Sequence, residues 1–307
     1  MTSRRDKVHK ILSFAIELTN DEDRAEVRRQ LSTLIQTYPT FRIELNVLES
    51  SLIVSGEDEL QLMELRAKIA PQHEAKIGEL KISYKESIRR RAEAEGKYFR
   101  QTGGLGNYGH VKIRLEPNDP GKGFEFVNDI TGGVVPKEYI KPTEMGVREA
   151  LQNGVLAGYE MVDFKAILFG GSYHDVDSNE MAFKIAGSIA FKEAAKKASP
   201  VLLEPMMAVE VTAPEEHMST IIGDINSRRG RIEGMEHSGG SQVIKATMPL
   251  AEMLRSSEHG RPRYPMHFAG YQPAPAHGDF GDDAGACARK PWRPRPGTGS
   301  AAAELDE

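Results

Sequence analysis

The stretch QTGGLGNYGHVKIRLE, residues 101–116, places a glycine-rich loop directly before a run in which apolar and polar residues alternate. Its glycines Gly104, Gly106 and Gly109 spell the G-x-G-x-x-G pattern of dinucleotide-binding folds. In those folds the loop leads into a helix, whose amino terminus holds the pyrophosphate. Here the alternation over residues 111–115 predicts a strand, which excludes that fold. The glycines fit either a tight turn with positive φ or a backbone that approaches a partner closely.

Other nucleotide-binding motifs are incomplete. Val111 extends the loop to a kinase-like G-x-G-x-x-G-x-V, and residues 279–281 spell D-F-G, but no V-A-I-K lysine or H-R-D loop lies between them. No G-x-x-x-x-G-K-[ST] occurs to cradle a β-phosphate and hold magnesium through its hydroxyl. We therefore expect no bound GTP, no other cofactor and no catalytic residue, so the chain by itself is not expected to be an enzyme.

Three globular segments and a tail follow from the apolar periodicity, and together they predict an α+β protein. Residues 89–205 form a mixed segment, with a helix near 142–151, a strand over 161–169 and a long helix over 178–199 capped by Asp177 or Ser178. Residues 1–88 and 206–272 each predict the order β-α-β-β-α-β of a ferredoxin-like domain. Residues 273–307 lose the apolar pattern and are expected to be disordered.

The expected elements of the two ferredoxin-like segments can be placed from the same periodicity. In the first they are strands over 11–18, 41–45, 51–55 and 76–88, with helices over 27–35 and 60–65. In the last they are strands around 209–211, 231–236, 242–248 and 264–268, with helices that begin near Pro214 and Leu250.

Composition limits the class of protein. The 307 residues carry a net charge of −5, so a nucleic-acid contact would have to come from local basic patches. The single cysteine, Cys287, supports neither a disulfide framework nor a structural zinc site. No run of about 18 apolar residues is present, so no membrane contact is expected, and we expect a cytoplasmic protein.

One basic stretch lies around the glycine-rich loop. Residues 81–114 hold nine Lys or Arg against three Glu, and Arg89, Arg90 and Arg100 are close in sequence to aromatic residues such as Phe99. Cations beside aromatic rings suit RNA, because cations meet phosphates and rings stack on splayed bases. A solvated strand face is the alternative. The RRGR cluster at 228–231 is a second basic group, and there cations also suit the end of a helix.

A second loop, YHDVDS at 173–178, lies between a predicted strand and helix. Its His and two carboxylates match neither H-E-x-x-H nor a calcium-binding loop, so we expect no metal. Helix capping accounts for Asp177 and Ser178. It leaves Tyr173 and His174 unexplained on a loop, where functional residues are common.

Taken together, these motifs resemble those of bacterial elongation factor G, in family order and at family spacing. The matching words are QTGGLGNYGH at 101–110, GGVVP at 132–136, LAGY at 156–159, GSYHDVDS at 171–178, PVLLEP at 200–205, IGDI at 222–225 and RRG at 228–230. The resemblance is strong over 84–250 and weaker over 10–82. It implies domain III for 1–88, domain IV with a fold like ribosomal protein S5 domain 2 for 89–205, and domain V for 206–272.

The resemblance also implies a function. In that family the tip of domain IV enters the decoding site of the ribosome and supports translocation of tRNA and mRNA. The implied partners are ribosomal RNA and the tRNA–mRNA duplex, with a separate GTPase and domain II chain to drive the step. The expected RNA- or ribosome-binding residues are Gln101, Gly103, Gly104, Leu105, Gly106, Asn107, Tyr173, His174, Asp175, Asp177, Arg89, Arg90 and Arg100.

Three departures from the family pattern stand out. Leu105 replaces a usual Arg, residues 57–59 are acidic where the family is more neutral, and about six residues are absent after Met253. The last departure shortens the second helix of the domain V segment. There are two alternatives. The chain is a regulatory or degraded paralogue, or it is a stand-alone RNA-binding module without a role in translocation.

Overall fold

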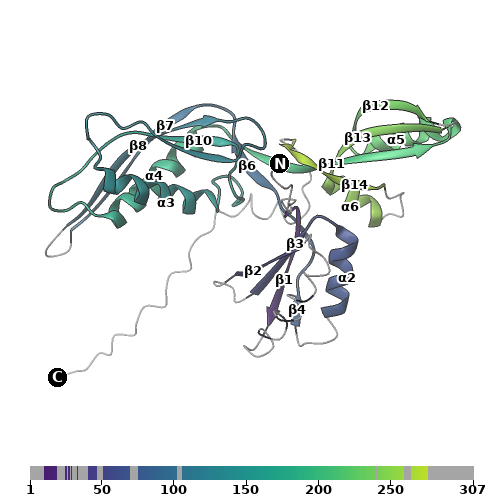
Figure 1. Cartoon of the computed structure of the whole chain (residues 1–307), viewed down its shortest axis with the longest axis horizontal. Helices are drawn as coiled ribbons and strands as arrows, with labels where there is room; N and C mark the ends of the chain where they lie inside the picture. Colours follow the sequence, from purple (N-terminus) through teal and green to yellow (C-terminus); the bar gives the residue numbers. More distant parts are fainter. Residues whose placement is uncertain are drawn as a thin grey trace, which may run out of the picture.

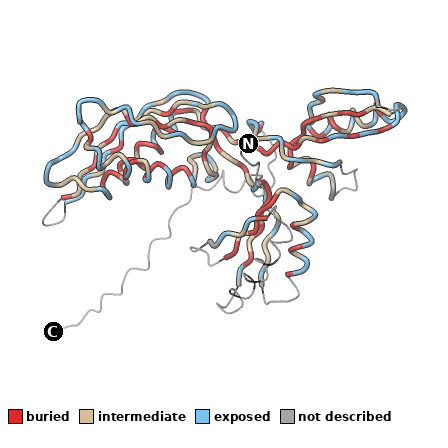
Figure 2. The backbone as a smooth tube through the Cα atoms, viewed as in Figure 1, coloured by how far each residue is buried: buried red, intermediate tan, exposed pale blue. Residues whose placement is uncertain are grey.

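Three antiparallel or mixed sheets make up the computed structural model (Figure 1). It describes residues 10–18, 41–46, 51–69, 75–101, 106–238, 241–258 and 264–275, together with positions 25, 27, 29 and 33. Buried residues follow the strands and the inward faces of the helices (Figure 2). The three sheets and the helices between their strands confirm the predicted α+β class.

The first sheet has the strand order β2-β3-β1-β4, and the pairs along this path are antiparallel. This is the strand order that β-α-β-β-α-β connectivity gives in a ferredoxin-like fold. The predicted helix over 27–35 falls mainly outside the described residues. The elements are β1 (Leu12–Leu18), β2 (Arg42–Asn46), β3 (Ser51–Gly56), α2 (Glu59–Ile69), β4 (Ala75–Ile77) and β5 (Lys81–Ile82).

The prediction of one continuous strand over residues 76–88 is wrong, because the structure has three short strands there. β4 and β5 both pair with β1, while β6 (Lys85–Ile88) pairs with β11 (Pro200–Ala213) in another sheet. Between β4 and β5 the chain stays beside β1 through one bond, in which Gly78 N donates to the Ala15 oxygen at 2.8 Å. Apolar alternation alone does not show which sheet a strand joins. A strand has the same two-residue alternation whichever sheet it pairs with.

The middle sheet has the order β7-β8-β10-β9, with β10 and β9 parallel, and carries two helices. Helix α4 packs tightly on β7 and β8 because glycines lie beneath it. A Cβ on Gly96 would lie 2.1 Å from the Ala186 oxygen, and one on Gly109 would lie 2.5 Å from the Ala182 oxygen. The elements are β7 (Ala92–Arg100), β8 (Asn107–Pro117), β9 (Phe124–Asn128), α3 (Lys137–Leu151), β10 (Phe164–Ser172) and α4 (Glu180–Lys197).

The third sheet has the order β12-β13-β11-β14, which repeats the order of the first. Helix α6, which the resemblance implies is short, packs against the protein through the buried Leu250 and Met253. The elements besides β11 are the 3-10 turn Glu215–His217, α5 (Met218–Ser227), β12 (Arg231–Ser238), β13 (Ser241–Pro249), α6 (Leu250–Glu258) and β14 (Met266–Pro273). The prediction that the disordered tail begins at 273 is wrong at its first residues, because Pro273 ends β14 and the buried Ala274 donates its amide to the Leu202 carbonyl at 2.9 Å. The rest of the predicted tail, from position 276 onward, lies outside the described residues.

Strand β11 joins the parts of the molecule. It begins directly after α4, pairs first with β6, and then becomes a central strand of the third sheet. The expected boundary at 205/206 therefore falls inside a continuous strand. Met207 of β11 and Leu250 of α6 belong to the hydrophobic core of the first sheet. The first and third sheets thus share a core, while the middle sheet extends away from their junction (Figure 1).

Candidate nucleic-acid interface

Two loops that are far apart in sequence meet at one end of the middle sheet. The hairpin of β7 and β8 closes where Arg100 pairs with Asn107, so Gln101 and Gly106 flank its connecting loop. The Gly106 amide donates to Oδ1 of Asp177 at 2.8 Å. The Tyr108 amide donates to the Asp177 carbonyl at 2.8 Å. The loops predicted to act together are therefore adjacent, although Gly103, Gly104 and Leu105 lie outside the described residues.

The second loop is a compact turn built around His174. The Ser178 amide donates to the His174 carbonyl at 3.1 Å, and the His174 amide donates to Oγ of Ser178 at 2.8 Å. The amides of Val176 and Asp177 point at Nδ1 of His174, at 3.4 and 3.3 Å. The imidazole is held by its own loop but stays 57% exposed. A ring that is fixed on one side and open on the other can donate to, or stack on, a nucleic acid.

The predicted capping of α4 by Asp177 or Ser178 is wrong. Asn179 is the N-cap, and its Oδ1 accepts from the Ala182 amide at 2.9 Å. The Asn179 side chain also donates from Nδ2 to Oδ1 of Asn107 at 2.7 Å, which ties the helix to β8. Asn is as good an N-cap as Asp or Ser, so residue type could not separate three consecutive candidates.

Exposed apolar and aromatic side chains gather at this end of the sheet. Phe99, Tyr173 and Val176 are 58%, 45% and 65% exposed. Tyr108 lies with its ring 6.4 Å from the His174 ring and 5.7 Å from the Lys97 ammonium. Bases can stack on exposed rings, and each stacked base is worth about 1–3 kcal/mol. Sequence reasoning singled out Tyr173 and missed Tyr108 as the link between the two loops.

The basic residues of the 81–114 stretch do not lie together. Arg100 ends β7 beside the loops, but Arg89 and Arg90 lie at the far end of α4. There the Arg90 Nε donates to the Lys197 carbonyl at 2.9 Å, as expected for a cation at a helix carboxyl end. A helix of 18 residues is about 27 Å long. Arg89 and Arg90 therefore do not form one surface with His174.

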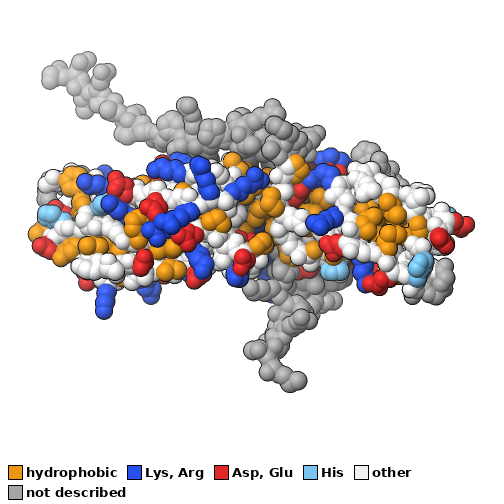
Figure 3. Space-filling view, turned by 90° about the horizontal axis from the view of Figure 1, so that it is seen from above, with side chains coloured by type: hydrophobic (Ala, Val, Ile, Leu, Met, Phe, Trp, Pro, Cys, Tyr) orange, Lys and Arg blue, Asp and Glu red, His pale blue; other side chains and the backbone are white. Residues whose placement is uncertain are grey.

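The face seen from above the molecule carries Lys and Arg interspersed with Asp and Glu (Figure 3). On the middle sheet, Arg114 pairs with Glu93 at 2.7 Å, and Lys165 pairs with Glu125 at 3.1 Å. These pairs fit the alternative of a solvated strand face. Within the stretch, Lys85 pairs with Glu160, and Arg91 and Arg114 both pair with Glu93, so part of its positive charge is balanced away from the loops.

The second basic cluster has a structural role. Arg228 is buried and pairs with Asp224 at 2.7 Å. Arg229 binds Glu204 through both terminal nitrogens at 2.8 Å each. Tyr264 donates to Asp224 at 2.8 Å, and burial together with this carboxylate raises the pKa of Tyr264 to about 12. The Arg229 Nε also donates to Glu252 of α6 at 3.2 Å, so the cluster joins α5, β11 and α6.

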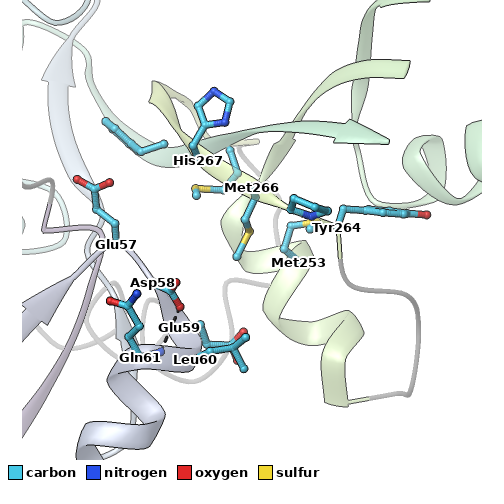
Figure 4. Close-up of a pocket in the computed structure, with 12 residues that line it drawn as sticks. Glu57, Asp58, Glu59, Leu60, Gln61, Met253, Tyr264, Met266 and His267 are labelled. Carbon is cyan, nitrogen blue, oxygen red and sulfur yellow. Dashed lines mark hydrogen bonds between the residues drawn. The ribbon is translucent and has the colours of Figure 1, made fainter. Parts of the chain in front are cut away.

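A cavity of about 430 Å³ lies between the first and third sheets (Figure 4). Acidic residues 57–59 at the start of α2 form one side, and Met207, Met253 and Met266 form the other. The elements α2, α6 and β14, which supply most of its lining, lie away from the loops of the middle sheet (Figure 1). Among the described residues, no cluster of His, Cys, Asp and Glu is arranged to hold a metal ion. No described helix has the length and apolar character needed to cross a membrane.

Comparison with known proteins gives matches over most of the chain. The family model "Elongation factor G, domain IV" matches residues 80–199, and "Elongation factor G C-terminus" matches residues 201–278. The crystal structure of a protein from Thermus thermophilus is similar, with a TM-score of 0.70 and 36% sequence identity. The similarity covers 93% of this chain and 44% of the Thermus chain, so this chain spans less than half of that one.

The two matched domains and the three-sheet architecture define a protein of the translation-factor class. More specifically, the chain belongs to the elongation factor G family, of which it carries domain IV and the C-terminal domain. These two domains are not the catalytic part of that family.

Proposed function

We propose that this chain binds the ribosome through the end of the middle sheet, with the loops around Gly106 and His174 facing RNA at the decoding site. The observation that carries the proposal is the pairing of these loops. They come from positions about 70 residues apart and are joined by the bonds of Gly106 and Tyr108 to Asp177. Beside them lie an exposed His and exposed rings, which suit phosphate, sugar and base contacts.

In this proposal the first sheet corresponds to domain III, and residues 1–88, 89–205 and 206–272 are the functional units. The ribosome contact supports tRNA–mRNA translocation when a separate GTPase and domain II chain supplies the driving step. The chain alone hydrolyses no GTP, since the sequence lacks a G-x-x-x-x-G-K-[ST] loop. A soluble, cytoplasmic location follows from a ribosomal partner.

Sedimentation of the purified chain with 70S ribosomes tests the proposal. We expect co-sedimentation at low salt that weakens as salt rises, because phosphate contacts release counterions. We also expect no GTP hydrolysis by the ribosome-free chain. Absence of the chain from the ribosome pellet at low salt would refute ribosome binding. If an unrelated RNA displaced the chain from ribosomes as effectively as unlabelled ribosomes do, the result would instead favour a stand-alone RNA-binding module.

A further inference from the structure

Asp177 contacts both loops at once. Its Oδ1 accepts from the Gly106 amide at 2.8 Å, and its carbonyl accepts from the Tyr108 amide at 2.8 Å. Its Oδ2 lies 3.4 Å from Nδ1 of His174, and the side chain is only 24% exposed. A single carboxylate thus lies between the backbone of one loop and the imidazole of the other.

We infer that Asp177 is a positioning residue, which holds the start of β8 at Gly106 and Tyr108 and the His174 loop in one fixed arrangement. The inference rests on the proposed function, in which the two loops together meet RNA. Asp177 points inward, so it acts through Gly106 and His174. RNA would repel a carboxylate that faced it, and the turned-in position lessens that repulsion.

Capping does not explain Asp177, because Asn179 already caps α4. The geometry also explains Gly106, which is buried. A Cβ on Gly106 would lie 2.9 Å from Cγ of Asp177, closer than such contacts allow. At Gly106 the close approach that the glycine permits is therefore to Asp177 of the same chain.

The inference predicts distinct effects for two substitutions at Asp177. Asp177→Ala removes the acceptor, so the Gly106 amide should exchange with solvent at least about tenfold faster, the effect of losing one hydrogen bond of about 1.4 kcal/mol. Asp177→Asn keeps an oxygen that can accept from Gly106 but removes the charge beside His174. It should leave Gly106 exchange nearly unchanged and still move the His174 ring signals in an NMR spectrum.

A double-mutant cycle tests the contact between the two residues. Gly106→Ala should disturb the loop when Asp177 is present and much less in the Asp177→Ala background, because the clashing carboxylate is gone. The two changes should therefore be non-additive in ribosome affinity. Asp119→Ala, in the exposed turn between β8 and β9 at the other end of the sheet, is the matched control.

The readouts separate this inference from the proposed function. Unchanged Gly106 exchange and unchanged His174 signals in Asp177→Ala would overturn the positioning role, whatever the ribosome result. Altered loops with ribosome affinity equal to that of Asp119→Ala would overturn the link between loop arrangement and binding. If the unsubstituted chain does not bind ribosomes, the proposed function fails, while exchange and NMR still decide whether Asp177 joins the loops.

Discussion

At the scale of single residues, His174 combines a defined ring orientation with exposure to solvent. Its Nδ1 is approached by two amides of its own loop, so the ring has a defined orientation. Its side chain is nevertheless 57% exposed, and the ring of Tyr108 lies beside it, at 6.4 Å. An oriented, exposed imidazole can contact a ligand at low entropic cost, because little rotamer freedom remains to be lost.

We predict that His174→Ala weakens ribosome binding by about tenfold, the loss of one contact to a charged phosphate or a stacked base. Because the ring is largely exposed, the urea midpoint of unfolding should change little. Binding is measured by sedimentation at fixed low salt, with Asp119→Ala as the control. Affinity equal to that of the control would count against His174 as an RNA contact.

At the scale of elements, the loop from α3 to β10 is organised by a buried carboxylate. Glu86 of β6 is fully buried and accepts four backbone amides. Its Oε2 accepts from Val155 and Leu156 at 2.7 and 2.9 Å, and its Oε1 accepts from Ala157 and Tyr159 at 2.8 and 3.1 Å. The LAGY word at 156–159 thus marks a backbone cradle for Glu86.

Glu86→Ala should lower the free energy of unfolding by about 3 kcal/mol or more, since four amides lose their acceptor. Glu86→Gln should also destabilise, because its NH2 group would face two amide donors. Urea unfolding measures both. Glu193→Ala, which removes an exposed ion pair with Lys196, should cost no more than about 1 kcal/mol. Glu86→Gln as stable as Glu193→Ala would contradict a cradle that needs both oxygens.

The elements were more predictable than their contacts. Apolar alternation located β8 and β10, and helical spacing located α4, because these patterns report burial directly. The same alternation could not show that β6 leaves the first sheet, since period two is common to every sheet. It could not show the roles of Glu86 and Tyr108, because each bonds to residues about 70 positions away. It missed the N-cap at Asn179 because Asp177, Ser178 and Asn179 are equally good candidates by residue type. The adjacency of the two loops came from the family resemblance.

At the scale of the whole molecule, the first and third sheets form one body. Met207 and Leu250 are buried in the core of the first sheet, and Phe268 packs against the same core. Tyr271 of β14 donates to the Ser83 carbonyl at 2.9 Å, and burial raises the pKa of that tyrosine. The middle sheet is linked to this body by β6 and β11.

We predict that Met207→Ala destabilises the first sheet although Met207 belongs to the third. Truncation of a buried Met costs about 2–5 kcal/mol, and here the lost contacts lie in the core of the first sheet. Native-state hydrogen exchange should show lower protection for amides of β1 and β3. Met248→Ala is the matched control, because Met248 is equally buried but lies in the core of the third sheet. It should reduce protection in β12 and β13 and spare β1. If both variants leave β1 and β3 equally protected, the two sheets are separate bodies, and the shared core does not couple them.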